Sequence, residues 1–116
     1  MSKEVIKPWG KYIDLERGDN LVIKKIVINP FQKFSLQKHF KREEFWYIIS
    51  GIGRITLGDK LHTVGPGDTF SIEVEQVHRL EAYSEGIVFV EVQQGDCTED
   101  DILRLEDDYN RVTERR

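Results

Sequence analysis

Short runs of alternating apolar and polar residues follow one another through most of this chain. In residues 21–29, LVIKKIVIN, one face carries Val22, Lys24, Ile26 and Ile28, and the run stops at Pro30. Residues 35–40, 44–50 and 87–92 repeat the pattern. A period of two is that of a β-strand, so the pattern predicts a protein built from strands.

Turn-forming residues separate these runs at intervals of about 8–12 residues, which is typical of an antiparallel sandwich or barrel. Leu57 to Leu61 contains a Gly-Asp turn and predicts a tight hairpin. Gly65-Pro66-Gly67-Asp68 predicts a second turn. The 116 residues are enough for one independent core, and we expect a single all-β domain over residues 1–116.

The C-terminal part has a different pattern. Thr98 precedes three acidic residues, as an N-cap precedes the first turn of a helix. Ile102, Leu105 and Tyr109 then recur at helical spacing. These features predict one short C-terminal helix.

Candidate metal ligands lie on the predicted strands. Gln37 and His39 share one face of their strand, about 7 Å apart. Glu44 lies on the returning strand, and His78 begins another alternating run, whereas we expect His62 to be exposed in a turn. If these faces meet, two imidazoles, a carboxylate and an amide oxygen converge. Such a set suits a divalent ion such as Zn, Mn, Co, Ni or Fe.

The spacing of these residues resembles the two cupin motifs. Gln37-x-His39-x4-Glu44-x6-Gly51 is similar to the first, with Gln in place of a His, and Gly67-x5-Glu73-x-Glu75-x2-His78 is similar to the second. More narrowly, the chain resembles the C-terminal cupin domain of type II phosphomannose isomerases. The further matching segments are PWGKY (8–12), IKKIVINP (23–30), SLQKH (35–39), Arg42, Trp46, HRL (78–80) and EVQQG with EDDILRLEDDYNR (91–111).

This resemblance implies a cupin fold, that is, a double-stranded β-helix or jelly-roll barrel, and it also implies an activity. The implied activity is metal-dependent interconversion of mannose 6-phosphate and fructose 6-phosphate, by a homodimer. The metal would act as a Lewis acid, and a base would move a proton between C2 and C1. We expect Lys24, Arg42, Arg79 and Arg111 to contact phosphate or an oxyanion, although alternation turns Arg79 away from the metal face. Glu73 and Glu91 are the candidate bases.

Alternatives remain open for several of these residues. Lys24 can snorkel at a sheet edge, and Arg111 can be an ordinary cation at a helix end. Phe40, Lys41, Glu43 and Phe45 replace histidines and an alanine that are usual in the resembling family. A non-catalytic cupin that binds a sugar or sugar phosphate is therefore the main rival hypothesis, and a metal-dependent oxygenase is the second.

Composition restricts the partners. The formal net charge is −4 and the pI about 5.4, which argues against general nucleic-acid binding. Residues 24–42 nevertheless carry six basic residues and no acid, which suits a small anionic ligand such as a sugar phosphate. No apolar run is long enough to cross a bilayer, no secretory signal is evident, and Cys97 is the single cysteine. We therefore expect a cytoplasmic protein with no membrane or nucleic-acid partner.

Overall fold

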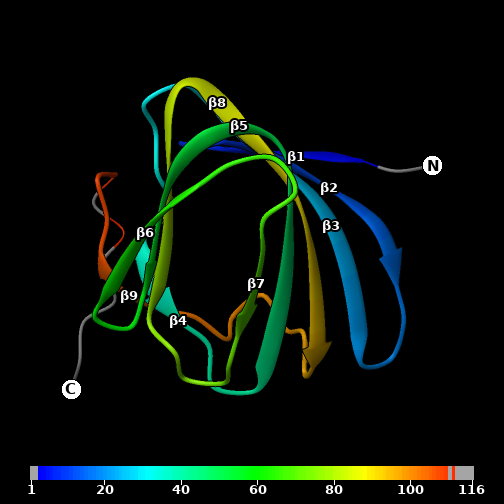
Figure 1. Cartoon of the computed structure of the whole chain (residues 1–116). Coiled ribbons are helices and arrows are strands. Elements are labelled where there is room, and N and C mark those ends of the chain that lie inside the picture. Colours follow the sequence, from blue (N-terminus) through cyan, green and yellow to red (C-terminus); the bar gives the residue numbers. More distant parts are fainter. Residues whose placement is uncertain (1–2, 110, 112–116) are drawn as a thin grey trace.

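The computed structural model of the chain describes residues 3–109 and 111, and the strands among them form one curled antiparallel sheet (Figure 1). No helix occurs in this described part. The strands are β1 (Glu4–Lys7), β2 (Gly10–Arg17), β3 (Leu21–Ile28), β4 (Leu36–Lys38), β5 (Arg42–Leu57), β6 (Lys60–Val64), β7 (Thr69–Ile72), β8 (His78–Gly95) and β9 (Leu103–Glu106). The predicted all-β class is thus confirmed.

The two longest strands, β5 and β8, pair along almost their whole length and arch together over the molecule (Figure 1). Register shifts after Ile48 and Gly51 let the pair bend, as β-bulges do. At Gly51 the backbone has φ +90°, and an added Cβ would lie 1.9 Å from the carbonyl oxygen of Gly86. Only glycine fits there, so the bend depends on this residue.

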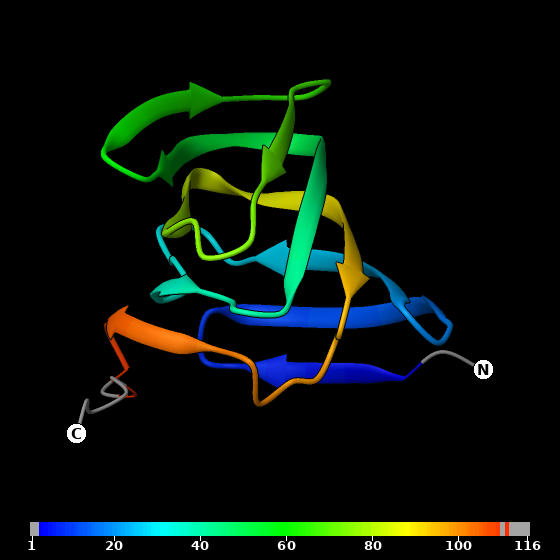
Figure 2. The same cartoon turned by 90° about the horizontal axis from the view of Figure 1, so that it is seen from below.

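The bend gives β8 two sets of neighbours. Its second half pairs with β3, whereas His78 at its start pairs with Gln37 of β4. The sheet order is β1-β2-β3-β8-β4-β9, while β5 carries β6 and β7 on the other side. The sheet consequently curls back on itself into a barrel (Figure 1 and Figure 2). Side chains from distant parts of the chain are buried on its inner face.

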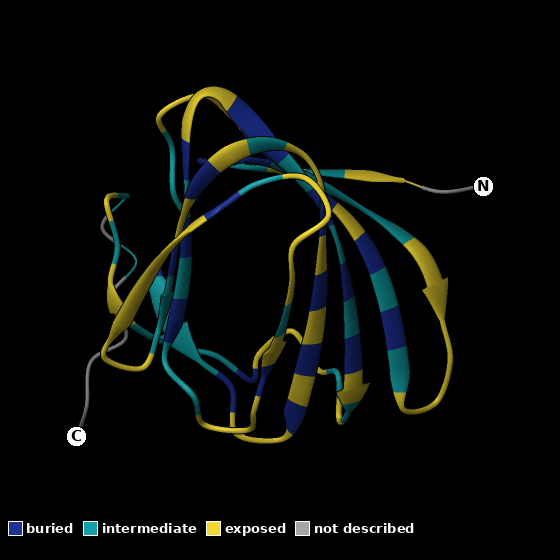
Figure 3. Ribbon diagram, viewed as in Figure 1, coloured by how far each residue is buried: buried dark blue, intermediate teal, exposed yellow. Residues whose placement is uncertain are grey.

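Alternation along the strands separates a buried inner row from an exposed outer row (Figure 3). The β-branched and aromatic residues that favour strands form the core inside the barrel. Its fully buried members include Val22, Ile28, Trp46, Ile48, Ile55, Leu80 and Phe89. On the outer face of β5, Phe45, Tyr47 and Ile49 are exposed. The homodimer stays a prediction. No helix in residues 3–109 and 111 is long and apolar enough to cross a membrane.

The prediction of a short C-terminal helix is wrong. A single turn forms, in which the Asp101 N–H donates to the Thr98 carbonyl, but the chain then continues as β9. β9 pairs with β4, with Gln37 opposite Arg104 and Lys38 opposite Leu103. Backbone pairing with β4 and burial of Leu103 therefore outweigh the local helix signal.

Candidate metal centre

Three strands bring the four predicted ligands together at the bottom of the barrel. Gln37 of β4 is the register partner of His78 of β8, His39 follows β4 directly, and Glu44 lies near the start of β5. One ligand atom each from His39, Glu44 and His78 lies within 4.8 Å of the others. All three side chains are buried. Their convergence from separate strands is the geometry that a metal site requires.

Both histidines are held in one orientation by their Nδ1 atoms. His39 Nδ1 donates to the Asp101 carbonyl at 2.6 Å, and His78 Nδ1 donates to the Gln76 carbonyl at 2.9 Å. The Nε2 lone pairs therefore remain for the centre of the group. Burial lowers the pKa of each imidazole to about 4, with a contribution from Arg42 at His39. Neutral imidazoles with Nε2 directed inward fit a divalent metal ion.

The Gln37 amide completes the group. Its Nε2 lies 3.5 Å from Nε2 of His39 and 3.5 Å from Nε2 of His78, while its Oε1 accepts a hydrogen bond from Ser35 at 2.7 Å. A half-turn of the amide would present the oxygen to the histidines. The Ser35 hydroxyl can accept as well as donate, so it satisfies the amide in both orientations. Gln37 therefore fits an oxygen ligand.

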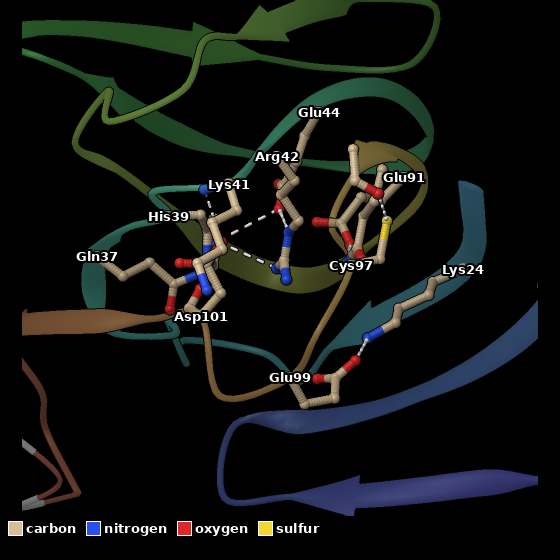
Figure 4. A network of polar contacts seen from close by, with 12 residues as sticks. Lys24, Gln37, His39, Lys41, Arg42, Glu44, Glu91, Cys97, Glu99 and Asp101 are labelled. Atoms are coloured by element: carbon tan, nitrogen blue, oxygen red, sulfur yellow. Dashed lines mark hydrogen bonds and ion pairs between the residues drawn. The ribbon is translucent and has the colours of Figure 1, made fainter. Parts of the chain in front are cut away.

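Arg42 contacts two members of the group. Its Nε donates to Glu44 Oε2 at 3.0 Å, and its Nη2 lies 3.2 Å from His39 Nε2 (Figure 4). An imidazole Nε2 has one lone pair. It can therefore accept a hydrogen bond from the guanidinium or coordinate a metal ion, but not both. Binding of an ion at His39 therefore requires this contact with Arg42 to break.

A second buried carboxyl group, that of Glu91 on β8, lies beside Glu44. The Trp46 indole N–H contacts both, at 3.0 Å from Glu44 Oε1 and 3.2 Å from Glu91 Oε1. Gln93 Nε2 donates to Glu91 Oε2 at 2.7 Å. Burial raises the pKa of Glu91 to about 8, and the negative charge of Glu44 adds to this. Glu91 is thus held as a neutral acid at pH 7.

A pocket of about 510 Å³ adjoins the group, and two of the four predicted ligands, Gln37 and His39, line it. Of the residues expected to bind substrate, Lys24, Arg42 and Arg111 line it. Lys24 Nζ is 2.7 Å from Glu99 Oε2 and 4.0 Å from the centre of the Tyr12 ring. The whole lining consists of Lys7, Trp9, Tyr12, Lys24, Ile26, Phe34, Gln37, His39, Arg42, Glu91, Gln93, Glu99, Asp100, Ile102, Arg104 and Arg111.

Two of the predicted site residues lie outside this pocket. Arg79 donates from Nε to the Phe34 carbonyl at 3.0 Å and from Nη1 to Glu106 at 3.3 Å. Glu73 is exposed in the turn before β8. We therefore do not include either residue in the function proposed below.

Sequence reasoning did not identify Trp46, Gln93 or Asp101 as parts of the site. The Asp101 carboxylate accepts from the backbone N–H groups of Phe40 and Lys41 at 2.9 and 2.8 Å, so the residue fixes the turn between β4 and β5 as well as His39. Alternation on β8 gave a signal for Gln93, because it shares the inner face with Glu91.

The fold is that of the cupins, as predicted. Oxalate decarboxylase of Bacillus subtilis superimposes with a TM-score of 0.79 at 23% identity, over 90% of this chain and 30% of that chain. KdgF of Halomonas sp. does so with a TM-score of 0.75 at 14% identity, over 87% and 91%. At these identities the similarity establishes the fold alone.

The chain belongs to the family described as mannose-6-phosphate isomerase C-terminal, which matches residues 1–107. A mannose-1-phosphate guanylyltransferase of Salmonella muenchen is 37% identical over 105 residues, which are 89% of this chain and 22% of that protein. The alginate biosynthesis protein AlgA of Pseudomonas aeruginosa is 37% identical over 113 residues, or 96% and 24%. The chain thus spans about a quarter of the length of these relatives.

Proposed function

We propose that this protein is a metal-dependent sugar-phosphate isomerase that interconverts mannose 6-phosphate and fructose 6-phosphate. One observation carries the proposal: two neutral, inward-facing histidines, a carboxylate and an amide converge beside a pocket that Gln37, His39 and several basic residues line. Membership of the isomerase C-terminal family supports this choice of reaction.

In this proposal Gln37, His39, Glu44 and His78 hold a divalent ion such as Zn, Mn, Co, Ni or Fe. The ion, when bound, polarises the sugar carbonyl or hydroxyls as a Lewis acid. Arg42, released from His39, stays within reach of the same space and supplies positive charge for a developing enediolate.

Glu91 is our candidate for the group that moves the proton. Its pKa of about 8 lies close to neutral pH, where a carboxyl group can both accept and return a proton. The ionised form would take the proton from C2 of mannose 6-phosphate, and the resulting acid would return it to C1. The proton of the O2 hydroxyl passes to O1, which yields fructose 6-phosphate and leaves the enzyme unchanged.

Basic side chains give the pocket affinity for an anionic substrate. Lys24 and Arg111 line it, each already paired with an acid, Glu99 and Asp107. A sugar phosphate that enters can take over one of these cations, because phosphate accepts charge-assisted hydrogen bonds strongly. The main rival, a non-catalytic cupin that binds the same ligand, would use these contacts without proton transfer.

The test combines metal analysis with an activity assay. We expect about one divalent ion per chain by mass spectrometry, and formation of fructose 6-phosphate from mannose 6-phosphate in a coupled assay. His78→Ala should abolish both, whereas His62→Ala should change neither, because His62 is exposed on β6. Metal without turnover would favour the binding module, and a chain without metal would refute the proposed function.

A further inference from the structure

Three basic side chains outside the metal group line one part of the pocket. Lys7 ends β1, Arg104 lies on β9, and Arg111 follows β9 near the C-terminus. All three are half-buried. They come from segments far apart in the sequence, and Figure 2 shows the turn between β1 and β2 lying close to β9. Lys7 and Arg104 have no part in the function proposed above.

The sheet register places Arg104 on the pocket side. Arg104 is the register partner of Gln37, and opposed residues of antiparallel strands project from the same face. Gln37 points at the two histidines, so Arg104 lies beside it on the same face. Lys7 also lies near Lys24, because the Tyr12 ring is 5.9 Å from Lys7 Nζ and 4.0 Å from Lys24 Nζ.

The fold holds these like charges close enough to repel one another. Burial lowers the pKa of Lys7, and after the opposing effect of Glu99, Arg104 and Arg111 lower it further. Burial lowers the pKa of Arg104 as well, and Arg111 adds to this. Two acids offset part of this positive charge, since Asp107 acts on Arg104 and pairs with Arg111, and Glu99 acts on Lys7. Three acids line the pocket itself: Glu91, Glu99, which is bound to Lys24, and the exposed Asp100.

One of the three is already fixed in position. Arg111 donates from Nε to Asp107 Oδ2 at 2.7 Å and from Nη2 to Asp107 Oδ1 at 3.2 Å, and the Asp107 side chain is fully buried. A guanidinium in a fixed plane loses little freedom when it binds an anion. Trp9, which lines the same pocket, provides an apolar surface beside the cations.

We propose that Lys7, Arg104 and Arg111 form an anion subsite that binds the phosphate monoester of the substrate, separate from the metal group. Guanidinium groups bind phosphate through paired N–H donors, and the ammonium group of Lys7 adds a further charge-assisted donor. The proposal rests on the proposed function and deepens it. In a hexose 6-phosphate the phosphate lies at the opposite end of the carbon chain from C1 and C2. Binding it at a subsite apart from the metal group therefore directs C1 and C2 to the metal group.

The experiment measures phosphate binding and catalysis separately. Calorimetric titration with inorganic phosphate is carried out on the chain after EDTA treatment, so that metal-bound phosphate does not contribute. We expect Lys7→Gln and Arg104→Gln to weaken phosphate binding at least tenfold. Lys7→Arg, which keeps the positive charge, should retain it. Arg54→Gln is the matched control, because Arg54 pairs with Glu81 outside the pocket. In the metal-loaded chain, Lys7→Gln should raise KM for mannose 6-phosphate with bound metal unchanged.

The outcomes separate the two proposals. Phosphate binding that depends on Lys7, in a chain without isomerase turnover, would support the proposed subsite and refute the proposed isomerase activity. Turnover whose KM does not respond to Lys7→Gln would overturn the subsite alone. Phosphate binding that Lys7→Gln leaves unchanged would also overturn it. Lys7 ends a strand and is half-buried, so this variant is informative even if Arg104→Gln fails to fold.

Discussion

Gln37 and His78 are 41 positions apart in the chain, yet they face each other across β4 and β8, with Gln37 Nε2 3.5 Å from His78 Nε2. Because β4 has only three residues, this single register pair fixes where the amide meets the imidazole. The position of Gln37 is therefore set by the same backbone pairing that closes the barrel.

Removal of the amide tests whether Gln37 is a ligand. We expect Gln37→Ala to lower metal affinity by about 10–100-fold, the range found when groups that support a metal site are removed. Competition with a chromogenic chelator measures the affinity. Gln94→Ala is the control, because Gln94 is the exposed neighbour of Gln93 on β8 and should leave affinity unchanged. Equal affinities for all three proteins would exclude Gln37 from the ligand set.

Asp101 supports the site through three hydrogen bonds, one from His39 to its carbonyl and two from backbone amides to its carboxylate. We expect Asp101→Ala to reduce the free energy of unfolding by about 2–3 kcal/mol, since hydrogen bonds to a charged group contribute more than neutral ones. Urea unfolding gives the value. Asp100→Ala, at the exposed neighbouring position, should change it by less than about 0.5 kcal/mol. Similar losses in both variants would contradict this role.

The alternation of residues was sufficient to predict the strands and the shared face of Gln37 and His39, because side chains alternate between the two faces of any strand, whatever it pairs with. The alternating run that begins at His78, together with the exposed turn expected for His62, indicated His78 as a ligand, but no local pattern tells which distant strand will pair with β4. Trp46 was part of the matched family pattern, but its contact with the carboxyl groups of Glu44 and Glu91 depends on the register between β5 and β8.

The segment 98–109 shows why the remaining features were not predictable. Thr98 and the acids after it do form a turn, as an N-cap sequence predicts. The carboxylate of Asp101, however, binds backbone amides of the β4–β5 turn, some 60 positions earlier. Tertiary contacts of this kind override a helix signal that is correct only locally. For the same reason, the position of Glu73 relative to the pocket could not be inferred before the sheet register was known, whereas alternation alone indicated that Arg79 points away from the metal face.

The bend of β5 predicts that replacement by alanine destabilises the protein much more at Gly51 than at Gly58. Gly51→Ala would bring Cβ to 1.9 Å from the Gly86 carbonyl oxygen at φ +90°, so we expect a loss of more than about 3 kcal/mol, or failure to fold. Gly58, in the β5–β6 hairpin, has φ +60° with nothing within 4 Å, so Gly58→Ala should lose only about 1 kcal/mol. Thermal unfolding of the two variants compares them. A Gly51→Ala protein as stable as Gly58→Ala would show that the close approach to Gly86 is not rigid.

The buried acid and the two histidines make opposite contributions to the pH dependence of stability in the metal-free protein. The pKa of Glu91 rises from 4.5 to about 8 on folding, so the folded chain retains a proton that the unfolded chain releases, and stability falls as pH rises across that window. The pKa of His39 and His78 falls from 6.5 to about 4, so stability falls as pH drops from about 6.5 to 4.

Between about pH 6.5 and 8, Glu91 is therefore the one of these three groups that changes stability with pH. We expect the free energy of unfolding of the EDTA-treated chain to decrease with rising pH, by up to about 1.4 kcal/mol per unit. Urea unfolding at pH 6.5, 7.2 and 8.0 measures the slope. Glu91→Gln should flatten it, because the amide does not titrate, whereas Glu73→Gln at an exposed position should preserve it. A slope that persists in Glu91→Gln would mean that another group titrates in this range, and Glu91 would then no longer be a neutral acid at pH 7.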